Sequence, residues 1–518
     1  MIARPEQTID HGRRLRRCPS LLAAMFAVLT LLGDDISVPA AFAAGHRDQP
    51  AGTRSSVQRP ISRKIWYSHS KQPLRAVGLA RHRRETMRRK QHSPVGARRP
   101  LPSFRDFARP TNQLAGLPHR SQQAPSQRSR PEVISRQILV LVNADEPTSI
   151  GSSLAQTYGL HHLSSQTIAL LDARAELFHV PEGRSESAVL EALQQDRRVR
   201  LAQLNRRYFH TDMRSHRYQH TGEEKGRLAR EEAIALPQYG PLKLALPEAH
   251  QIALGRNVRI AVIDASLDTT HPDLKGAVIK SFDAVGGRDA SPDFHGTAVA
   301  GIIRARGVVE GAAPEANLLA VRAFRTVGPA SVPETTTDVL ITAVDWVFKN
   351  GARIINMSFV GTHDPVLQQL LAAANRKGIV AVAAAGNGGP DAPAAYPAAY
   401  PGVIAVTAID QSDARYVHAN RGSYITVAAP GVDILAPVEQ GGHAYVSGTS
   451  FATAYVSGIA ALLLERDPEL DAHAVTELIT MGADDVGPSG RDDEFGAGRA
   501  NALSSLQLLL GSGPSAKK

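Results

Sequence analysis

Three polar side chains stand where this sequence predicts that a strand ends or a helix begins. Asp264 closes the apolar run "VRIAVID", His295 opens "HGTAVAGII", and Ser450 lies in "SGTSFATAYVSG", directly ahead of "IAALLLER". Each residue is ordinary by itself, because acids often follow strands and hydroxyl side chains often cap helices. Together, a carboxylate, an imidazole and a hydroxyl are the three groups that acyl-transfer catalysis requires.

The chemistry of acyl transfer suggests a role for each group. A serine hydroxyl is a poor nucleophile at neutral pH, so an imidazole must take its proton during attack. His295 suits this task because an unperturbed imidazole titrates at about pH 6.5, and Asp264 would hold the ring in the required tautomer. Negative charge then develops on the substrate carbonyl oxygen. The side-chain amide of Asn387, which follows "IVAVAAAG", and the backbone N–H of Ser450 could donate to that oxygen.

The segments that must position these residues alternate between strand and helix from about Pro241 onward. Five nearly continuous apolar runs read as strands: "VRIAVID", "NLLAVRAF", "RIINMSF", "GIVAVAAAG" and "GVIAVTAID". Helical segments separate them, among them "TTDVLITAVDWVFKN" and "PVLQQLLAAANRK". Unbroken apolar strands predict a parallel sheet covered on both faces, hence a three-layer α/β domain over residues 241–510, with a tail at 511–518. Functional sites in such sheets collect at the carboxyl ends of the strands.

Four separated segments in this region, "VIDASLDTTHPDL", "HGTAVAGII", "AAAGNGG" and "GTSFATAYVSGIAALL", resemble the subtilisin-like serine proteases, and so does the order Asp, His, Ser. The resemblance implies that Asp264, His295 and Ser450 form a catalytic triad and that Asn387 is the oxyanion donor. It also implies that the primary specificity pocket is bordered by Ser358, Phe359, Val360, Ala385 and Gly386. The segment "RARGVVE" is short where the family often has a calcium-binding loop, so we assign no metal and no cofactor.

Residues 137–209 predict a separate α+β domain. The strand "QILVLVN" precedes the helix "SIGSSLAQTYG", two strands around a turn at residues 173–174, the helix "SESAVLEALQQD" and the strand "RVRLAQLN". This β-α-β-β-α-β order is ferredoxin-like. The unit is similar to the propeptides of subtilisin-like proteases, which implies a folding chaperone and intramolecular inhibitor whose end crosses the active site. The resemblance further implies self-cleavage between about Phe209 and Leu242, in the linker expected at residues 210–240.

The N-terminal part of the chain has a different composition. Residues 1–44 combine clustered arginines, the apolar run "LLAAMFAVLTLL" and the small residues "AFA", which predicts an export signal, or alternatively an uncleaved anchor. Residues 45–136 hold 21 Lys or Arg against 4 Asp or Glu, and we expect a disordered basic region that could contact anionic surface polymers or nucleic acid. The single cysteine, Cys18, would leave with the signal, so no disulfide is expected.

The sequence therefore predicts a secreted or periplasmic serine endopeptidase that acts on proteins or peptides through an acyl-enzyme on Ser450. We expect it to be made as an autoprocessed zymogen, inhibited by its own prodomain, and to be monomeric. Two alternatives remain open. One is a non-catalytic binding protein with the same fold, suggested by Ser266 and Ala454, where the family usually has glycine and proline. The other is a protein whose basic segment, anchored on the envelope or on nucleic acid, dominates its role.

Overall fold

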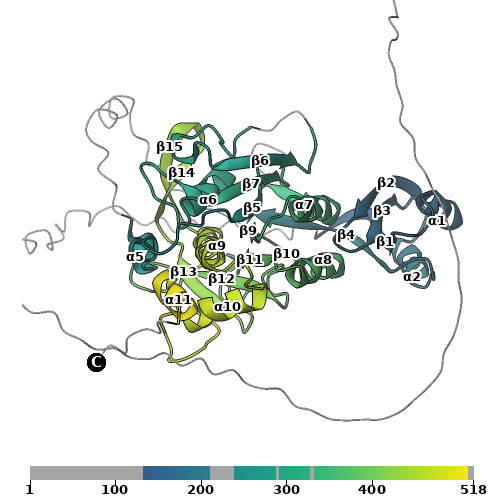
Figure 1. Ribbon diagram of the computed structural model, residues 1–518. Helices are drawn as coiled ribbons and strands as arrows, with labels where there is room; N and C mark the ends of the chain where they lie inside the picture. Colours follow the sequence, from purple (N-terminus) through teal and green to yellow (C-terminus); the bar gives the residue numbers. More distant parts are fainter. Residues whose placement is uncertain (1–131, 211–237, 288–290, 327–331, 512–518) are drawn as a thin grey trace, which may run out of the picture. The chain divides into compact units, whose positions relative to one another are not determined.

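The computed structural model describes residues 132–210, 238–287, 291–326 and 332–511 (Figure 1). All of them belong to one compact unit, Pro118–Lys518. The expected export signal, the basic region, nearly all of the linker and most of the tail lie outside the described residues. Within the described ranges, no helix combines the length and the apolar character that a membrane span requires.

The large subdomain (residues 239–511) is built on a seven-stranded sheet in the order β13-β12-β11-β9-β5-β7-β6. Every neighbouring pair in it is parallel. Its strands are β5 (Arg259–Asp264), β6 (Val278–Asp283), β7 (Asn317–Arg322), β9 (Ile354–Met357), β11 (Val380–Ala384), β12 (Val403–Ile409) and β13 (Val427–Pro430). The central strands are buried on both faces, as their unbroken apolar sequences predict.

Helices cover both faces of this sheet, so the predicted three-layer arrangement is confirmed (Figure 1). One face shares a hydrophobic core with α6 (Phe294–Arg304) and α9 (Thr449–Arg466). The other face packs against α7 (Thr337–Lys349) and α8 (Pro365–Arg376). Helix α9 is buried along nearly its whole length, which explains why its sequence is apolar or small on every side rather than on one stripe.

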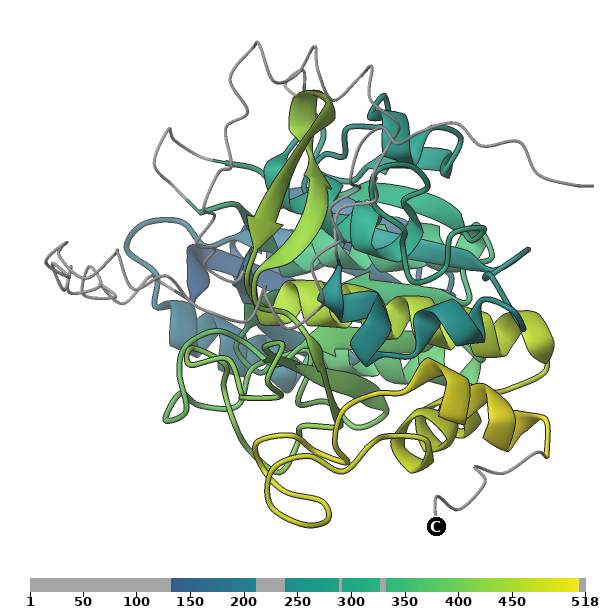
Figure 2. The same cartoon turned by 90° about the vertical axis from the view of Figure 1, so that its left-hand side faces the viewer.

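Shorter elements complete the large subdomain. Strands β14 (Ile434–Val438) and β15 (Gly442–Val446) form an antiparallel hairpin, which Figure 2 shows as a green two-stranded ribbon. Its other helices are α4 (Tyr239–Lys243), α5 (Leu246–Ala249), α10 (Ala472–Met481) and α11 (Ala502–Leu509), and its 3₁₀ turns are η1 (Pro272–Leu274) and η2 (Glu439–Gly441).

The small subdomain (residues 133–210) follows the predicted β-α-β-β-α-β order. Its elements are β1 (Val133–Asn143), α1 (Ile150–Tyr158), β2 (His161–Ile168), β3 (Ala173–His179), α2 (Glu186–Gln194) and β4 (Leu201–His210). The four strands lie antiparallel in the order β4-β1-β3-β2. The two helices and the sheet enclose a core that includes Ile138, Phe178 and Leu193.

Two local expectations for this subdomain were wrong. The turn expected at residues 173–174 lies at residues 169–172, where Asp172 has a left-handed φ of 49° and its N–H donates to the carbonyl of Ala169. The linker was expected to begin at residue 210, but His210 is the last residue of β4. The strand continues because it gains further backbone partners in the large subdomain.

Strand β4 connects the two subdomains through backbone pairing. It lies antiparallel to both β10 (Phe359–Gly361) and β8 (Glu334–Thr336). Buried polar contacts add to this pairing: the Gln203 amide donates to Asp364 at 2.9 Å, and the N–H of Leu170 donates to Asp345 at 3.0 Å. Apolar side chains of the small sheet also share the core of α7 and α8.

Candidate active site

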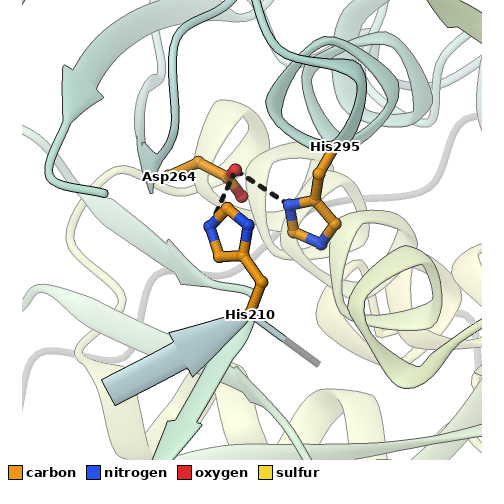
Figure 3. A group of neighbouring side chains, drawn as sticks. All are labelled: His210, Asp264 and His295. Carbon is orange, nitrogen blue, oxygen red and sulfur yellow. Dashed lines mark hydrogen bonds and ion pairs between the residues drawn. The ribbon is translucent and has the colours of Figure 1, made fainter. Parts of the chain in front are cut away.

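Asp264 and His295 form a buried hydrogen-bonded pair (Figure 3). Asp264 is the last residue of β5, and His295 lies in the first turn of α6, whose N-cap Asp293 accepts from the His295 N–H at 2.9 Å. His295 Nδ1 lies 2.8 Å from Asp264 Oδ1, and both side chains are at most 1% exposed. The N–H of Ala265 donates to the same carboxylate oxygen at 2.8 Å. Nδ1 therefore carries the proton shared with Asp264, which leaves Nε2 as the basic nitrogen.

Gly296 allows the close approach of α6 to the turn that follows β5. A Cβ at this position would lie 2.9 Å from the side chain of Leu267 and 3.1 Å from the carbonyl oxygen of Ser266. A larger residue would crowd the side chain of Leu267 and the carbonyl oxygen of Ser266, so the absence of a Cβ favours this close approach.

Ser450 and Asn387 meet at the N-terminus of α9. Ser450 lies in the first helical turn, and its Oγ donates to the carbonyl of Ser358 at 3.2 Å. The Asn387 Oδ1 accepts from the N–H and the hydroxyl of Thr449 at 3.1 and 3.0 Å, which fixes the orientation of the amide. Its Nδ2 is buried near the backbone of Gly448 and has no hydrogen-bond partner within the described parts of the chain. This amide is therefore placed to donate to a group bound beside Ser450.

The other residues predicted to bind substrate lie after two adjacent strands, β9 and β11. They are Ser358, Phe359 and Val360 on one segment and Ala385 and Gly386 on the other. Phe359 and Val360 belong to β10 and pair with β4. Gly386 has a φ of 105°, and its N–H donates to the Thr449 hydroxyl at 3.2 Å. The carboxyl edge of the sheet thus collects both segments, as expected for a parallel α/β fold.

His210, which the sequence analysis did not place in the site, lies against the Asp264–His295 pair. Its ring is 3% exposed and stacks on the ring of His295, with centroids 4.3 Å apart and planes at 28°. Phe324 lies against it at the same centroid distance, with planes at 33°. The His210 Nε2 lies 3.3 Å from Asp264 Oδ1 (Figure 3). The sequence did contain one sign that β4 extends to His210. The ring-bearing residues "YFH" (residues 208–210) follow the polar pair "RR" (residues 206–207) and favour a continued strand.

These neighbouring groups shift one another's pKa values. Burial raises the pKa of Asp264, but attraction to His295 and His210 and the hydrogen bonds it accepts outweigh burial, so its pKa lies below the usual range. Burial lowers the pKa of His295, but Asp264 outweighs it and the net shift is upward. For His210, burial dominates over the attraction of Asp264 and lowers the pKa to about 3. At neutral pH the site therefore holds a charged carboxylate and a neutral His210.

The same three side chains offer metal-ligand atoms within 4.8 Å of one another. Ligation of one ion would require the nitrogen lone pairs of both rings to converge on one point. The rings of His210 and His295 are instead stacked, and Nδ1 of His295 is already hydrogen-bonded to Asp264. The geometry therefore favours proton transfer over metal binding.

Comparison with known proteins gives consistent matches to one family. Residues 255–498 match the subtilase family. The chain is 37% identical over 278 residues to thermitase from Thermoactinomyces vulgaris, which covers 52% of this chain and 96% of thermitase. It is 35% identical over 296 residues to subtilisin E from Bacillus subtilis (strain 168), which covers 55% of this chain and 74% of that protein.

A solved structure gives a match in fold. Fervidolysin from Fervidobacterium pennivorans, a keratinolytic enzyme related to subtilisin, aligns with a TM-score of 0.62 and 23% identity. The alignment covers 73% of this chain and 61% of fervidolysin. At this identity the likeness concerns the fold alone.

Proposed function

Because the chain belongs to the subtilase family and is a serine endopeptidase, we propose that Asp264, His295 and Ser450 are its catalytic triad and Asn387 its oxyanion donor. The observation that carries this proposal is the buried 2.8 Å hydrogen bond between His295 Nδ1 and Asp264 Oδ1. It lies at the sheet edge that also receives the N-terminus of α9 and the amide of Asn387.

The reaction would proceed by proton transfer through His295. The Ser450 hydroxyl turns from the Ser358 carbonyl toward His295 Nε2, loses its proton to it and attacks the substrate carbonyl carbon. Asp264 stabilises the imidazolium that forms, and Asn387 Nδ2 donates to the oxyanion. One such donor contributes about 3 kcal/mol of transition-state stabilisation. His295 then protonates the leaving amine, and water hydrolyses the acyl-enzyme by the same steps.

Labelling with a serine-directed phosphonate tests the nucleophile. Ser457 provides a matched control, because it lies in the same helix and its hydroxyl donates to Asn356 at 2.9 Å. We expect the phosphonate to label wild type and Ser457→Ala, but not Ser450→Ala, with the adduct mapped to Ser450 by mass spectrometry. Labelling that persists in Ser450→Ala would contradict the assignment.

We also propose that the small subdomain acts as an intramolecular inhibitor. The sequence predicted it at residues 137–209, and in the structure its last strand ends at His210. Support comes from β4, which pairs with β8 and β10 in the manner of a substrate strand and brings His210 against His295. Self-cleavage is expected between Phe209 and Leu242, and the chain after His210 lies outside the described residues until residue 238. Mass spectrometry should find wild type cut in this interval and Ser450→Ala intact. An uncut wild type that still cleaves peptides would argue against a zymogen.

Export and anchoring are further parts of the proposal. Residues 1–44 would direct the chain out of the cytoplasm, and residues 45–136 would hold it on anionic surface polymers through their positive charge. N-terminal sequencing of the exported protein tests the first point. Salt-dependent release from cell envelopes, compared between the full chain and a chain lacking residues 45–136, tests the second point. The chain that lacks residues 45–136 should cleave peptides at the same rate as the full chain.

A further inference from the structure

We propose that Asn420 is a positioning residue for the oxyanion donor Asn387, because it holds the backbone on both sides of that donor. The inference rests on the proposed function and deepens it by naming what fixes the donor in place. Asn420 lies in the loop that follows β12 and is 3% exposed. Nothing in its local sequence, "HANRG" (residues 418–422), marks it for this role.

Asn420 is hydrogen-bonded to both neighbours of Asn387. Its Oδ1 accepts from the N–H of Gly388 at 2.8 Å, and its backbone N–H donates to the carbonyl of Gly386 at 3.0 Å. Its Nδ2 donates to the carbonyl of Pro393 at 3.3 Å, farther along the same loop. One end of the amide therefore accepts and the other donates, which fixes the orientation of the side chain. Asn387 lies between two anchored peptide groups.

Gly386 makes room for the Asn420 amide. It has a φ of 105°, and a Cβ at this position would lie 2.7 Å from Asn420 Nδ2 and 3.0 Å from its Cγ. Here, two residues after the end of β11, the chain turns toward Asn387. The Asn420 amide thus packs against the turn as well as bonding to it. Its removal would leave a space into which the turn could move.

The contacts of Asn420 complement those that the Asn387 side chain already has. The N–H and the hydroxyl of Thr449 donate to Asn387 Oδ1, which fixes the rotation of the amide but not the backbone that carries it. The place of Asn387 Nδ2 beside Ser450 depends on both. An oxyanion donor must lie at hydrogen-bond distance from the oxygen of the transition state, and a displacement of about 1 Å can lower the rate about 100-fold. Asn420 supplies the second constraint.

The Asn420 side chain can be removed while its backbone contact stays. Asn420→Ala keeps the N–H that donates to Gly386 but loses the contacts to Gly388 and Pro393. In the self-processed enzyme, we expect kcat on a peptide p-nitroanilide that wild type cleaves to fall by about 10- to 100-fold, with KM changed by less than about threefold. Active sites are counted by complete labelling with the phosphonate. An unchanged kcat would overturn the inference.

A double-mutant cycle separates positioning from a general structural role. If Asn420 acts through Asn387, Asn420→Ala should lower kcat by less than about threefold once Asn387→Ala is present, because the donor that it positions is gone. Losses that multiply in the double variant would show that Asn420 acts independently of Asn387, and would overturn the inference. If Asn420→Ala does not fold, Asn420→Ser, which keeps a hydroxyl acceptor on a shorter side chain, enters the same cycle with the same two outcomes.

Asn375 provides a matched control at the opposite edge of the sheet. Its Nδ2 donates to the carbonyl of Gly402 at 2.8 Å, and its amide also lies against a glycine of positive φ, since Gly402 has a φ of 79°. Gly402 directly precedes β12, so this pair lies at the amino ends of the strands. Asn375→Ala should keep kcat within about twofold of wild type, because active sites in such sheets lie at the carboxyl ends. A loss as large as that of Asn420→Ala would overturn the inference.

Asn387→Ala separates this inference from the proposed function. If Asn387→Ala lowers kcat and Asn420→Ala does not, the positioning role fails and the oxyanion assignment stands. If Asn387→Ala keeps the wild-type kcat while Ser450→Ala abolishes cleavage, both the oxyanion assignment and the positioning role fail, and the nucleophile assignment stands.

Discussion

Acidification should loosen β4 from the site, because His210 is buried there as a neutral ring. Burial lowers its pKa to about 3 in the docked strand, against about 6.5 for a free imidazole. A group whose pKa is lowered on docking stabilises the docked state fully only above its free pKa, and this contribution is lost as the pH falls from about 6.5 toward 3. The charged groups that face it are Asp264, which favours protonation, and His295, which opposes it.

The size of the effect follows from the two pKa values. Between pH 7.5 and 5.0, released His210 gains most of a proton while the docked ring gains almost none. Docking then weakens by about 30-fold, or about 2 kcal/mol, at about 1.4 kcal/mol per pH unit below 6.5. His295, whose pKa is raised, also contributes a titration. A variant that changes only His210 keeps that titration and therefore serves as its control.

Hydrogen exchange of the β4 amides in full-length Ser450→Ala measures this equilibrium without self-cleavage. The His210 N–H, which donates to the carbonyl of Pro333 at 3.2 Å, reports on docking directly. After correction for intrinsic exchange at each pH, the chain with His210 should lose about 30-fold more protection than one that also carries His210→Phe. Equal losses in both chains would refute the reasoning. Stronger protection at pH 5.0 would show instead that attraction to Asp264 outweighs burial.

Three further substitutions test the site and its scaffold. Asp264→Asn should lower kcat on peptide substrates on the order of 10⁴-fold, because the imidazole loses its orienting carboxylate; a loss below tenfold would exclude the assigned role. Asn387→Ala should lower kcat by about 10²- to 10³-fold with little change in KM, and a change confined to KM would point to substrate binding instead. Gly458→Ala should lower the free energy of unfolding by about 1–3 kcal/mol, since the new Cβ overlaps Ala312; an unchanged urea midpoint would contradict this packing argument.

Much of the fold could be predicted from the sequence, because the patterns that indicate its strands and helices lie within short stretches of the chain. Unbroken apolar runs indicate burial on both faces, so the parallel strands and the helices between them follow from short stretches of sequence. Asp264 follows such a run, and the order of the Asp, His and Ser segments matches a known family, so the candidate residues could be named in advance. The turn at residues 169–172 could not, because a non-glycine residue, Asp172, adopts the left-handed conformation there.

The sequence alone determined the parallel sheet, the candidate residues and the order of elements in the small subdomain. Only the tertiary structure showed that His210 belongs to the site, since its partners on β10 and at His295 lie far along the chain. The side-chain pattern of a strand indicates which of its faces are buried, but it does not indicate which other strands pair with it. Pairing is decided by the joint packing of distant segments, and here that packing brings the end of β4 against the Asp264–His295 pair.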